Sequence, residues 1–171
     1  MPKVVDHEAR RTELLDVAFE NFAERGYAAL SMRGLASAMG VTTGLLYHYF
    51  PSKEVIFEQA MMQRSKDRIA AALDRVLPLE SAGERMGELL DWLCEEQVQL
   101  SRMLLLALDA QRAAGDEAQL VERASAAFES TLEEHFPEAP GLWTQLLGSL
   151  TAARLSGRPL KPANLGHLVR A

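Results

Sequence analysis

Hydrophobic positions recur at helical spacing along almost the whole chain, which predicts an all-α protein of about nine helices. Ala and Leu supply 52 residues, whereas Val, Ile and Thr supply only 17, and this composition also favours helix over strand. The first helix is expected to begin at a cap on Asp6 and to end at Arg25, before Gly26. Its apolar stripe consists of Leu15, Ala18, Phe19 and Phe22.

Residues 30–57 predict two short helices separated by a tight turn. Ser31 is placed to cap the first, and Thr42 or Thr43 to cap the second, because a hydroxyl accepts a hydrogen bond from an amide of the first turn. Gly40 suits the left-handed conformation that reverses the chain between them. Ala36, four positions earlier, is small enough for close helix approach. This order of elements predicts a helix-turn-helix that docks on duplex DNA.

The second of these helices is expected to bury one face and to expose the other. Leu46, Tyr49 and Phe50 are predicted to point inward. Thr43, Gly44, Tyr47 and His48 are predicted to point outward. The outward set contains no acidic residue, as a surface that faces phosphates requires.

The local charge supports this assignment. No Asp or Glu lies between Glu24 and Glu54, so Arg25, Arg33 and Lys53 make this segment +3 in a chain of net charge −6. Residues 1–78 carry ten basic and ten acidic side chains, and residues 79–171 carry eight and fourteen. The acidic excess therefore lies away from the predicted DNA-binding face. An ordinary helical hairpin with an uncharged surface is the alternative, and residues 10–11, both arginine, are either DNA contacts or part of a solvated helix face.

The run MRGLASAMGVTTGLLYHYFPSKEVIF, preceded by FAERGY, resembles the DNA-binding domain of the TetR family of transcriptional regulators. The resemblance implies that one set of residues approaches base edges or the groove: Thr42, Thr43, Gly44, Leu45 and His48. It implies that a second set holds phosphates: Ser31, Arg33, Tyr47 and Lys53. Many members carry a charged or amide residue near Thr43 or Leu45. Because both are short or apolar here, base recognition is expected to use methyl contacts to thymine, hydroxyls and His48.

The chain is expected to divide into a helix-turn-helix DNA-binding domain over 1–51 and a helical regulatory and dimerisation domain over 52–171. No Gly or Pro interrupts the segment from Lys53 to Val76, so residues 52–76 are predicted to form one helix that connects the two domains. After a linker at 78–83, helical spacing continues to Leu108, with a break expected at Ser101. Further helices are predicted to end at His135, to span 142–155 and to follow Pro162.

Aromatic and methionine side chains in the second domain allow two interpretations. Such residues at helical spacing are usually core, but the family resemblance implies that these helices enclose a pocket for a small-molecule effector. The candidate pocket residues are Met61, Met86, Trp92, Met103 and Phe128.

Leucines near the C-terminal end of the sequence predict a dimer interface. The candidates are Leu142, Leu146, Leu147, Leu150 and Leu155, on a helix that also carries small residues. In a monomer the same stripe would be core. A homodimer would place two recognition helices on a palindromic operator, one helical turn of DNA apart.

No catalytic, metal or cofactor site is predicted. The four histidines, at 7, 48, 135 and 167, are isolated, and no second ligand lies at metal-binding spacing. Cys94 is the single cysteine, so no intrachain disulfide forms. No signal peptide or membrane span is recognised, so a soluble cytoplasmic protein is expected. The sequence thus predicts a non-enzymatic DNA-binding regulator, in particular a homodimeric repressor released by an effector. The alternative is an effector-independent architectural or partner-recruiting protein of the same fold.

Overall fold

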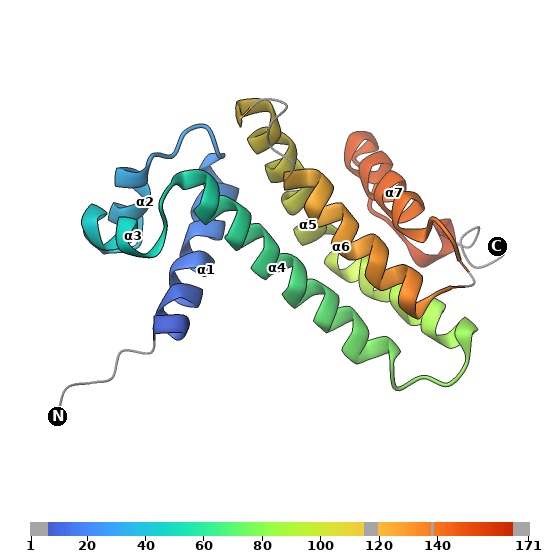
Figure 1. The fold of residues 1–171 in the computed structure, drawn as a ribbon. Coiled ribbons are helices and arrows are strands. Elements are labelled where there is room, and N and C mark those ends of the chain that lie inside the picture. Colours follow the sequence, from blue (N-terminus) through green and yellow to red (C-terminus); the bar gives the residue numbers. More distant parts are fainter. Residues whose placement is uncertain (1–6, 115–119, 138, 166–171) are drawn as a thin grey trace. The chain divides into compact units, whose positions relative to one another are not determined.

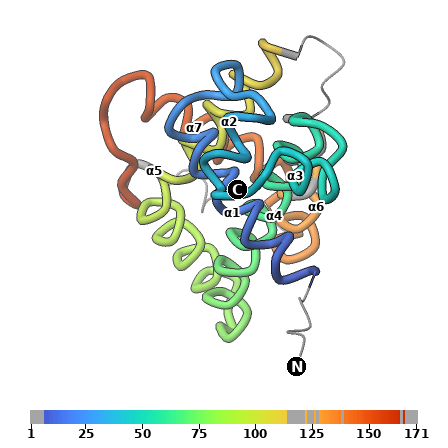
Figure 2. Tube along the Cα trace, turned by 90° about the vertical axis from the view of Figure 1, so that its left-hand side faces the viewer, coloured from blue at the N-terminus to red at the C-terminus, as the bar shows by residue number. Residues whose placement is uncertain are grey.

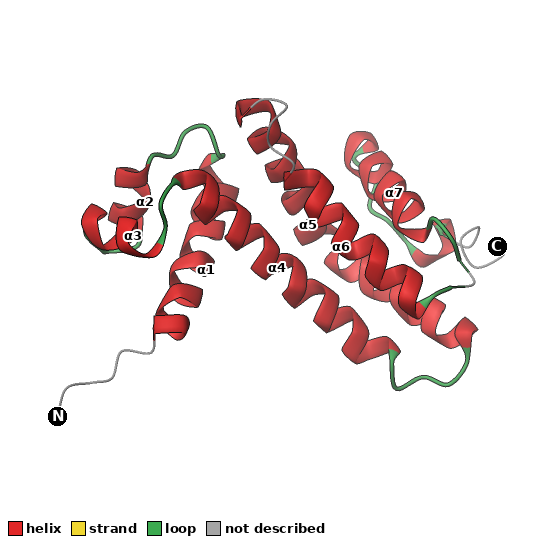
Figure 3. Cartoon of the chain, in the orientation of Figure 1, coloured by secondary structure: helices red, strands yellow, loops and turns green. Residues whose placement is uncertain are grey.

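The computed structural model describes residues 7–114, 120–137 and 139–165, which form helices and loops and contain no strand (Figures 1 and 3). The helices are α1 (His7–Arg25), α2 (Met32–Ala38), α3 (Thr43–Tyr49), α4 (Lys53–Val76), α5 (Ala82–Ala114), α6 (Leu120–His135), α7 (Leu142–Ser156) and the short 3-10 helix η1 (Pro162–Asn164). The all-α prediction is confirmed. The expected cap Asp6 lies outside the described residues.

The described residues form fewer helices than the nine expected, and one reason is that the break predicted at Ser101 is wrong. α5 continues through this position from Ala82 to Ala114. No Gly or Pro occurs after Gly87 in this helix, and a serine inside a helix costs only a fraction of a kcal/mol, roughly 0.5, relative to alanine. The packing of the long apolar face of α5 outweighs this small cost.

The chain forms two compact units. Unit 1 contains residues 1–64 and 106–120, and unit 2 contains residues 65–105 and 121–171. α4 and α5 each contribute residues to both units. The functional boundary expected at residues 51–52 stays a prediction, since division by packing falls later, within α4.

The core of unit 1 is built on α1. The predicted stripe is buried, and Phe22 is completely so. The ring of Phe57 from α4 packs edge-on against Phe22, at 5.2 Å between centroids, and against Tyr27, at 4.9 Å. Tyr27 follows Gly26, which ends α1 with a left-handed φ of 81°. Aromatic packing therefore fixes the first turns of α4 and the turn after α1 to the same face of α1.

α2 and α3 pack against each other and lie side by side in both views (Figures 1 and 2). Ser31 caps α2, since its Oγ accepts a hydrogen bond from the amide of Gly34 at 3.2 Å. Thr42, rather than Thr43, caps α3, with 3.1 Å from its Oγ1 to the amide of Leu45. Gly40 adopts a φ of 65° between them. The predicted caps and turn are thus present, and the buried Ala36 leaves room for the crossing.

Unit 2 is organised around one apolar cluster from the second half of α4, from α5, from α7 and from the segments that follow α6 and α7. α5 begins with a capping box in which Ser81 and Glu84 bond each other's backbone amides. Gln97 holds the segment after α7: its Oε1 accepts from the Leu160 amide at 2.7 Å and its Nε2 donates to the Leu160 carbonyl. None of the described helices is long and apolar enough to cross a membrane.

Candidate nucleic-acid interface

α3 presents the outward face that its sequence predicts. Gly44 and His48 are exposed, and Tyr47 keeps 52% of its surface accessible. Leu45 is also exposed, at 40%, whereas Thr43 is half-buried. A Cβ built on Gly44 meets no atom within 4 Å. The face is therefore accessible, and its centre, at Gly44, has no side chain.

The inward face differs from the prediction at one position. Leu46 and Phe50 are buried, but Tyr49 is only half-buried. Its hydroxyl lies 3.2 Å from Nδ1 of His7. Tyr49 therefore points inward only in part, because its polar end needs a hydrogen-bond partner, which the first turn of α1 supplies at the surface.

Arg11 of α1 binds both the C-terminal end of α3 and a side chain of α4, and sequence reasoning missed this role. Its guanidinium donates to the carbonyl of Tyr49 at 3.2 Å and to Oε1 of Gln59 at 2.6 Å, and lies 4.8 Å from the centroid of the Phe50 ring. The side chain is half-buried by these contacts. Arg11 meets its partners in α3 and α4 across 38 and 48 positions of the chain. No local sequence pattern predicts such contacts, so only the tertiary structure shows them. Neighbouring Arg10 instead pairs with Glu13 on α1 at 2.8 Å.

Two of the predicted phosphate contacts, Ser31 and Arg33, lie at the start of α2. Both are exposed, and the hydroxyl of Ser31 already accepts the capping hydrogen bond from Gly34. That hydroxyl still has its own hydrogen to donate. No carboxylate lies on α2 or α3. The surface around these donors is therefore compatible with a polyanion.

Lys53 is held by the protein itself. Its Nζ donates to the carbonyl of Tyr27 at 3.1 Å and sits 4.0 Å above the Tyr27 ring. The side chain is half-buried. An ammonium has three donors, so these contacts fix the direction of Lys53 and leave donors for a further acceptor.

Glu54, next to Lys53, is exposed but has a hydrogen-bond partner within the protein. It accepts a hydrogen bond from the Tyr27 hydroxyl at 3.0 Å. The Ser52 hydroxyl is the main group that lowers the pKa of Glu54 below its ordinary value, and its own backbone amide acts in the same direction. Burial, together with Glu54, raises the pKa of Tyr27. The first carboxylate after the acid-free segment, at the start of α4, is thus already hydrogen-bonded within the protein.

Residues 14–60 match the family described as bacterial regulatory proteins, tetR family. The HTH-type transcriptional repressor KstR2 of Rhodococcus jostii is 37% identical over 89 residues, which cover 48% of this chain and 44% of that repressor. The HTH-type transcriptional repressor Rv1474c of Mycobacterium tuberculosis is 40% identical over 77 residues, which cover 44% and 41%. The chain thus matches less than half the length of these relatives.

Solved structures extend the likeness over the whole fold. The regulator SCO7518 of Streptomyces coelicolor aligns with a TM-score of 0.71 at 26% identity, over 94% of this chain and 96% of that one. The fatty acid degradation regulator FadR of Bacillus halodurans aligns with a TM-score of 0.72 at 16% identity, over 92% and 94%, and shows the same fold. Residues 14–60 thus match the tetR family, and the chain as a whole shares the fold of these solved regulators.

An apolar cavity of about 40 Å³ lies within unit 2. The rings of Phe128 and Trp143 stack at its wall, 4.6 Å apart and nearly parallel. Of the predicted pocket residues, Trp92 and Phe128 line it. Met86 belongs to the surrounding core cluster, Met103 is buried elsewhere in unit 2, and Met61 belongs to unit 1.

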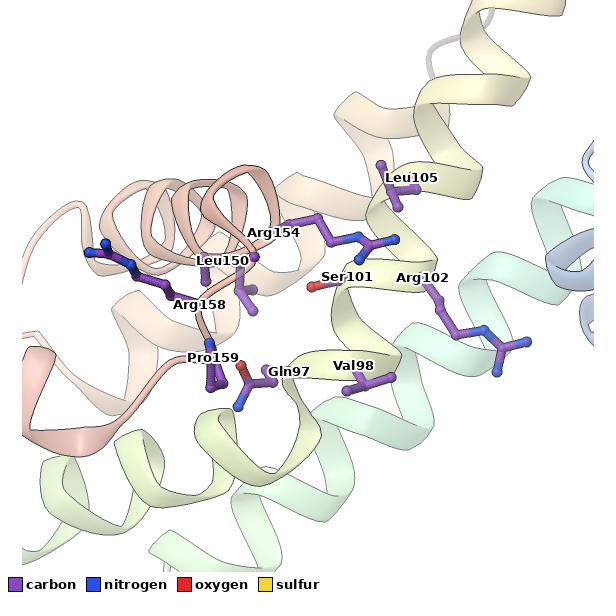
Figure 4. Close-up of a pocket in the computed structure, with 11 residues that line it drawn as sticks. Gln97, Val98, Ser101, Arg102, Leu105, Leu150, Arg154, Arg158 and Pro159 are labelled. Carbon is purple, nitrogen blue, oxygen red and sulfur yellow. The ribbon is translucent and has the colours of Figure 1, made fainter.

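A second, open pocket of about 330 Å³ lies between α5 and the end of α7 (Figure 4). Its floor includes Leu150 and Pro159. The guanidinium of Arg154 reaches over it towards Ser101, whereas those of the other two lining arginines, at 102 and 158, point away (Figure 4). One exposed cation over an open depression gives little enclosure, so the smaller apolar cavity is the better candidate for an effector.

α7 divides the leucines that were predicted to form a dimer interface. Leu142, Leu146 and Leu150 are each 3% exposed and belong to the core of unit 2. Leu147 is half-buried, and Leu155 is 84% exposed. The surface that α7 offers to a partner is therefore the Leu147–Leu155 side, which also carries the exposed Gly148.

Proposed function

We propose that this protein is a sequence-specific DNA-binding transcriptional regulator of the TetR family, and in particular a homodimeric repressor released from its operator by a small molecule. The exposed, carboxylate-free face of α3 carries the proposal. Thr42, Thr43, Gly44, Leu45 and His48 approach the bases, so α3 is the recognition helix. The phosphate contacts come from Ser31, Arg33, Tyr47 and Lys53, which position the protein but carry little sequence information.

The DNA-binding proposal is tested by selecting DNA fragments from a random pool with the purified protein and sequencing them. A palindrome is expected, because a two-fold dimer sets its two recognition helices about 34–36 Å apart. Affinity for the selected fragment, measured by fluorescence anisotropy, should exceed affinity for a scrambled fragment by a factor of about 10³ or more. Equal affinity for both fragments would leave only non-specific binding and refute the proposal.

The dimer proposal concerns the exposed side of α7. Leu155 is too exposed to contribute to a monomer core, and a single helix-turn-helix contacts few base pairs. Leu147→Glu and Leu155→Glu should each give monomers in analytical ultracentrifugation and lose operator binding while staying folded. Gln145→Glu, at an exposed position of α7 that is turned away from Leu147 and Leu155 around the helix, is the matched control for the added charge. A wild-type monomer on and off DNA would refute the dimer.

The effector proposal rests on the cavity in unit 2. At about 40 Å³ it is far below the ~300–1,000 Å³ of typical ligand pockets, so a ligand must open it. Every lining residue is uncharged. The polar groups among them are the Thr131 hydroxyl and the indole N–H groups of Trp92 and Trp143, and Nε1 of Trp143 is buried without a hydrogen-bond partner among the described residues. An ion would lose its hydration there without gaining a partner of opposite charge. We therefore propose an uncharged, apolar effector that inserts beside the stacked pair Phe128 and Trp143.

A thermal-shift screen of neutral apolar compounds tests this, with cationic and anionic analogues of equal size as controls. A ligand at 100 times its dissociation constant stabilises the native state by about 2.7 kcal/mol. Ala72→Leu adds volume to the wall of the cavity and should abolish the shift. If no compound shifts the melting temperature and the operator is still bound, the effector-independent alternative becomes the better account.

Release from DNA requires that the effector favour one arrangement of the dimer over another. A coupling of about 1–3 kcal/mol would reduce operator affinity about 5- to 150-fold.

α4 is the proposed connection. Gln63 and Arg64 tie it to α1, through Asp16 at 2.9 Å from Gln63 and Glu20 at 3.3 Å from Arg64. Lys66 and Asp67 follow these ties and are exposed. Replacing both with Gly should preserve operator binding but reduce the response to effector, measured by anisotropy.

A further inference from the structure

A carboxylate on α5 holds the turn between α1 and α2. Oδ2 of Asp109 accepts a hydrogen bond from the backbone amide of Tyr27 at 3.0 Å. Arg112, one turn later, donates to Oδ1 at 3.2 Å. This bond from Arg112, followed by the backbone amides of Tyr27 and Ala28, lowers the pKa of Asp109 although partial burial opposes the shift. The group is therefore an ionised acceptor at neutral pH.

Gly26 makes this approach possible. Its φ of 81° lies in the left-handed region, and a Cβ added there would be 3.3 Å from Oδ2 of Asp109. A side chain at this position would be strained by the backbone and would also press on the carboxylate. The glycine thus both ends α1 and clears the space in which the α5 carboxylate reaches the next amide.

Tyr27 links the turn held by Asp109 to later parts of the chain. Its hydroxyl donates to Glu54, and its carbonyl and ring hold Lys53. Its ring also packs between Phe22 and Phe57, at 5.7 and 4.9 Å between centroids. The residue whose amide Asp109 binds is therefore the one that connects α1, the turn before α2 and the start of α4.

We propose that Asp109 is a positioning residue for DNA binding, and that through it the last turns of α5 form a second connection to the DNA-binding helices beside α4. This inference rests on the proposed function. Asp109 touches no base or phosphate in the proposal. It acts by fixing the turn at Gly26–Ala28, from which the chain enters Ser31 and α2.

The continuity of α5 gives the attachment a regulatory role. The same uninterrupted helix contributes residues 82–105 to unit 2 and begins unit 1 again at Leu106. Its unit 2 portion lines the apolar cavity at Leu89, Trp92 and Leu93. A ligand that shifts or rotates this helix would move the carboxylate of Asp109 relative to the turn. Losing the bond would loosen the backbone turn at Gly26–Ala28, while the Tyr27 ring stays packed between Phe22 and Phe57.

The test compares Asp109→Ala, which removes the acceptor, with Asp109→Asn, which keeps one oxygen for the Tyr27 amide but not the ion pair. Arg112→Ala removes only the ion pair, and Asp91→Asn removes an exposed charge of α5 in unit 2. Amide hydrogen exchange at Tyr27 and Ala28 is measured without DNA. Affinity for the selected fragment is measured at a temperature at which circular dichroism shows every variant folded.

Asp109→Ala should exchange the Tyr27 and Ala28 amides about tenfold faster and bind DNA about tenfold more weakly, the size expected when a hydrogen-bonded donor loses its partner. Asp109→Asn should restore most of both, and the two controls should leave both near wild type. Unchanged exchange in Asp109→Ala would overturn the attachment. Faster exchange with unchanged DNA affinity would overturn the positioning role. A wild-type protein that binds no DNA would refute the proposed function, while exchange still decides whether Asp109 holds the turn.

Discussion

The helix-turn-helix and α7 both carry apolar residues at helical spacing, but their sequences determine the structure to different degrees. In α2 and α3 each structural decision has a local cause: Ser31 and Thr42 cap, Gly40 turns, and Ala36 permits the crossing. In α7 the apolar spacing leaves two possible partners, the core of its own unit and a second copy of the chain. Three leucines pack into the core.

The difference separates two kinds of information in a sequence. A cap or a turn residue acts within four positions, so its partner is known once the sequence is known. An apolar stripe states that a partner exists without stating which. The surface of α3 can therefore be assigned from the sequence, whereas the two sides of α7 require the structure.

The largest expected effect separates the two sides of α7. Leu146→Ala, at 3% exposure, should lower the free energy of unfolding by about 2–5 kcal/mol, because it removes buried methyl groups and leaves a cavity. Leu155→Ala, at 84% exposure, should change it by less than about 0.5 kcal/mol. Both are measured by urea denaturation at concentrations low enough to keep the chain monomeric. Similar losses of unfolding free energy for both variants would contradict the assignment of Leu146 to the core and of Leu155 to the surface.

The next effect concerns Gly44 at the centre of the α3 face. Gly44→Leu has open space for its side chain and improves helix propensity, so the melting temperature should stay the same or rise. Operator affinity should fall by on the order of 100-fold, about 2.7 kcal/mol, because the leucine keeps the backbone from the groove. Gly87→Leu in α5 has equally open space and is the control for propensity. Normal binding by the Gly44 variant would place the docking face elsewhere.

The elements whose causes are local could be predicted from the sequence. The ends of α1, α4 and α6, the caps at Ser31 and Thr42 and the buried stripe of α1 agree with the structure. The break expected at Ser101 was wrong because serine is only a weak local signal. A weakly unfavourable residue cannot end a helix whose apolar face is packed along its length. Local propensity decides only where tertiary contacts do not oppose it.

The remaining features depend on residues far apart in the chain. Asp109 meets Tyr27 across 82 positions, and Arg11 meets Gln59 across 48. Neither pair shares a pattern that spacing could reveal. The cavity shows the same limit: its two stacked rings, Phe128 and Trp143, come from α6 and α7, and only one of them was among the predicted pocket residues. Sequence identified the residue types that such a cavity uses but not which of them face it.

A smaller effect tests whether Thr42 has one role or two. Thr42→Ser keeps the hydroxyl that caps α3 and removes the methyl group, so stability should be unchanged while affinity for a site with thymine at the contacted position falls several-fold. Thr42→Val keeps the methyl and loses the cap, at a cost of about 1 kcal/mol in the free energy of unfolding. Denaturation and anisotropy distinguish the two. If both variants changed only stability, Thr42 would be a cap without a base contact.

Lys53→Ala should give the smallest change among these variants. Lys53 contributes both to the folded structure and to the proposed DNA contact. Its ammonium is held above the Tyr27 ring, so Lys53→Ala should destabilise the protein by about 0.5–1 kcal/mol through loss of this cation–π contact alone. If Lys53 also holds a phosphate, the variant should weaken binding to all duplexes alike and reduce the slope of log affinity against log salt by about one unit per half-site. Lys53→Arg keeps the charge and should preserve the slope. A destabilised Lys53→Ala protein with the wild-type salt slope would assign Lys53 to the Tyr27 contact and remove it from the DNA interface.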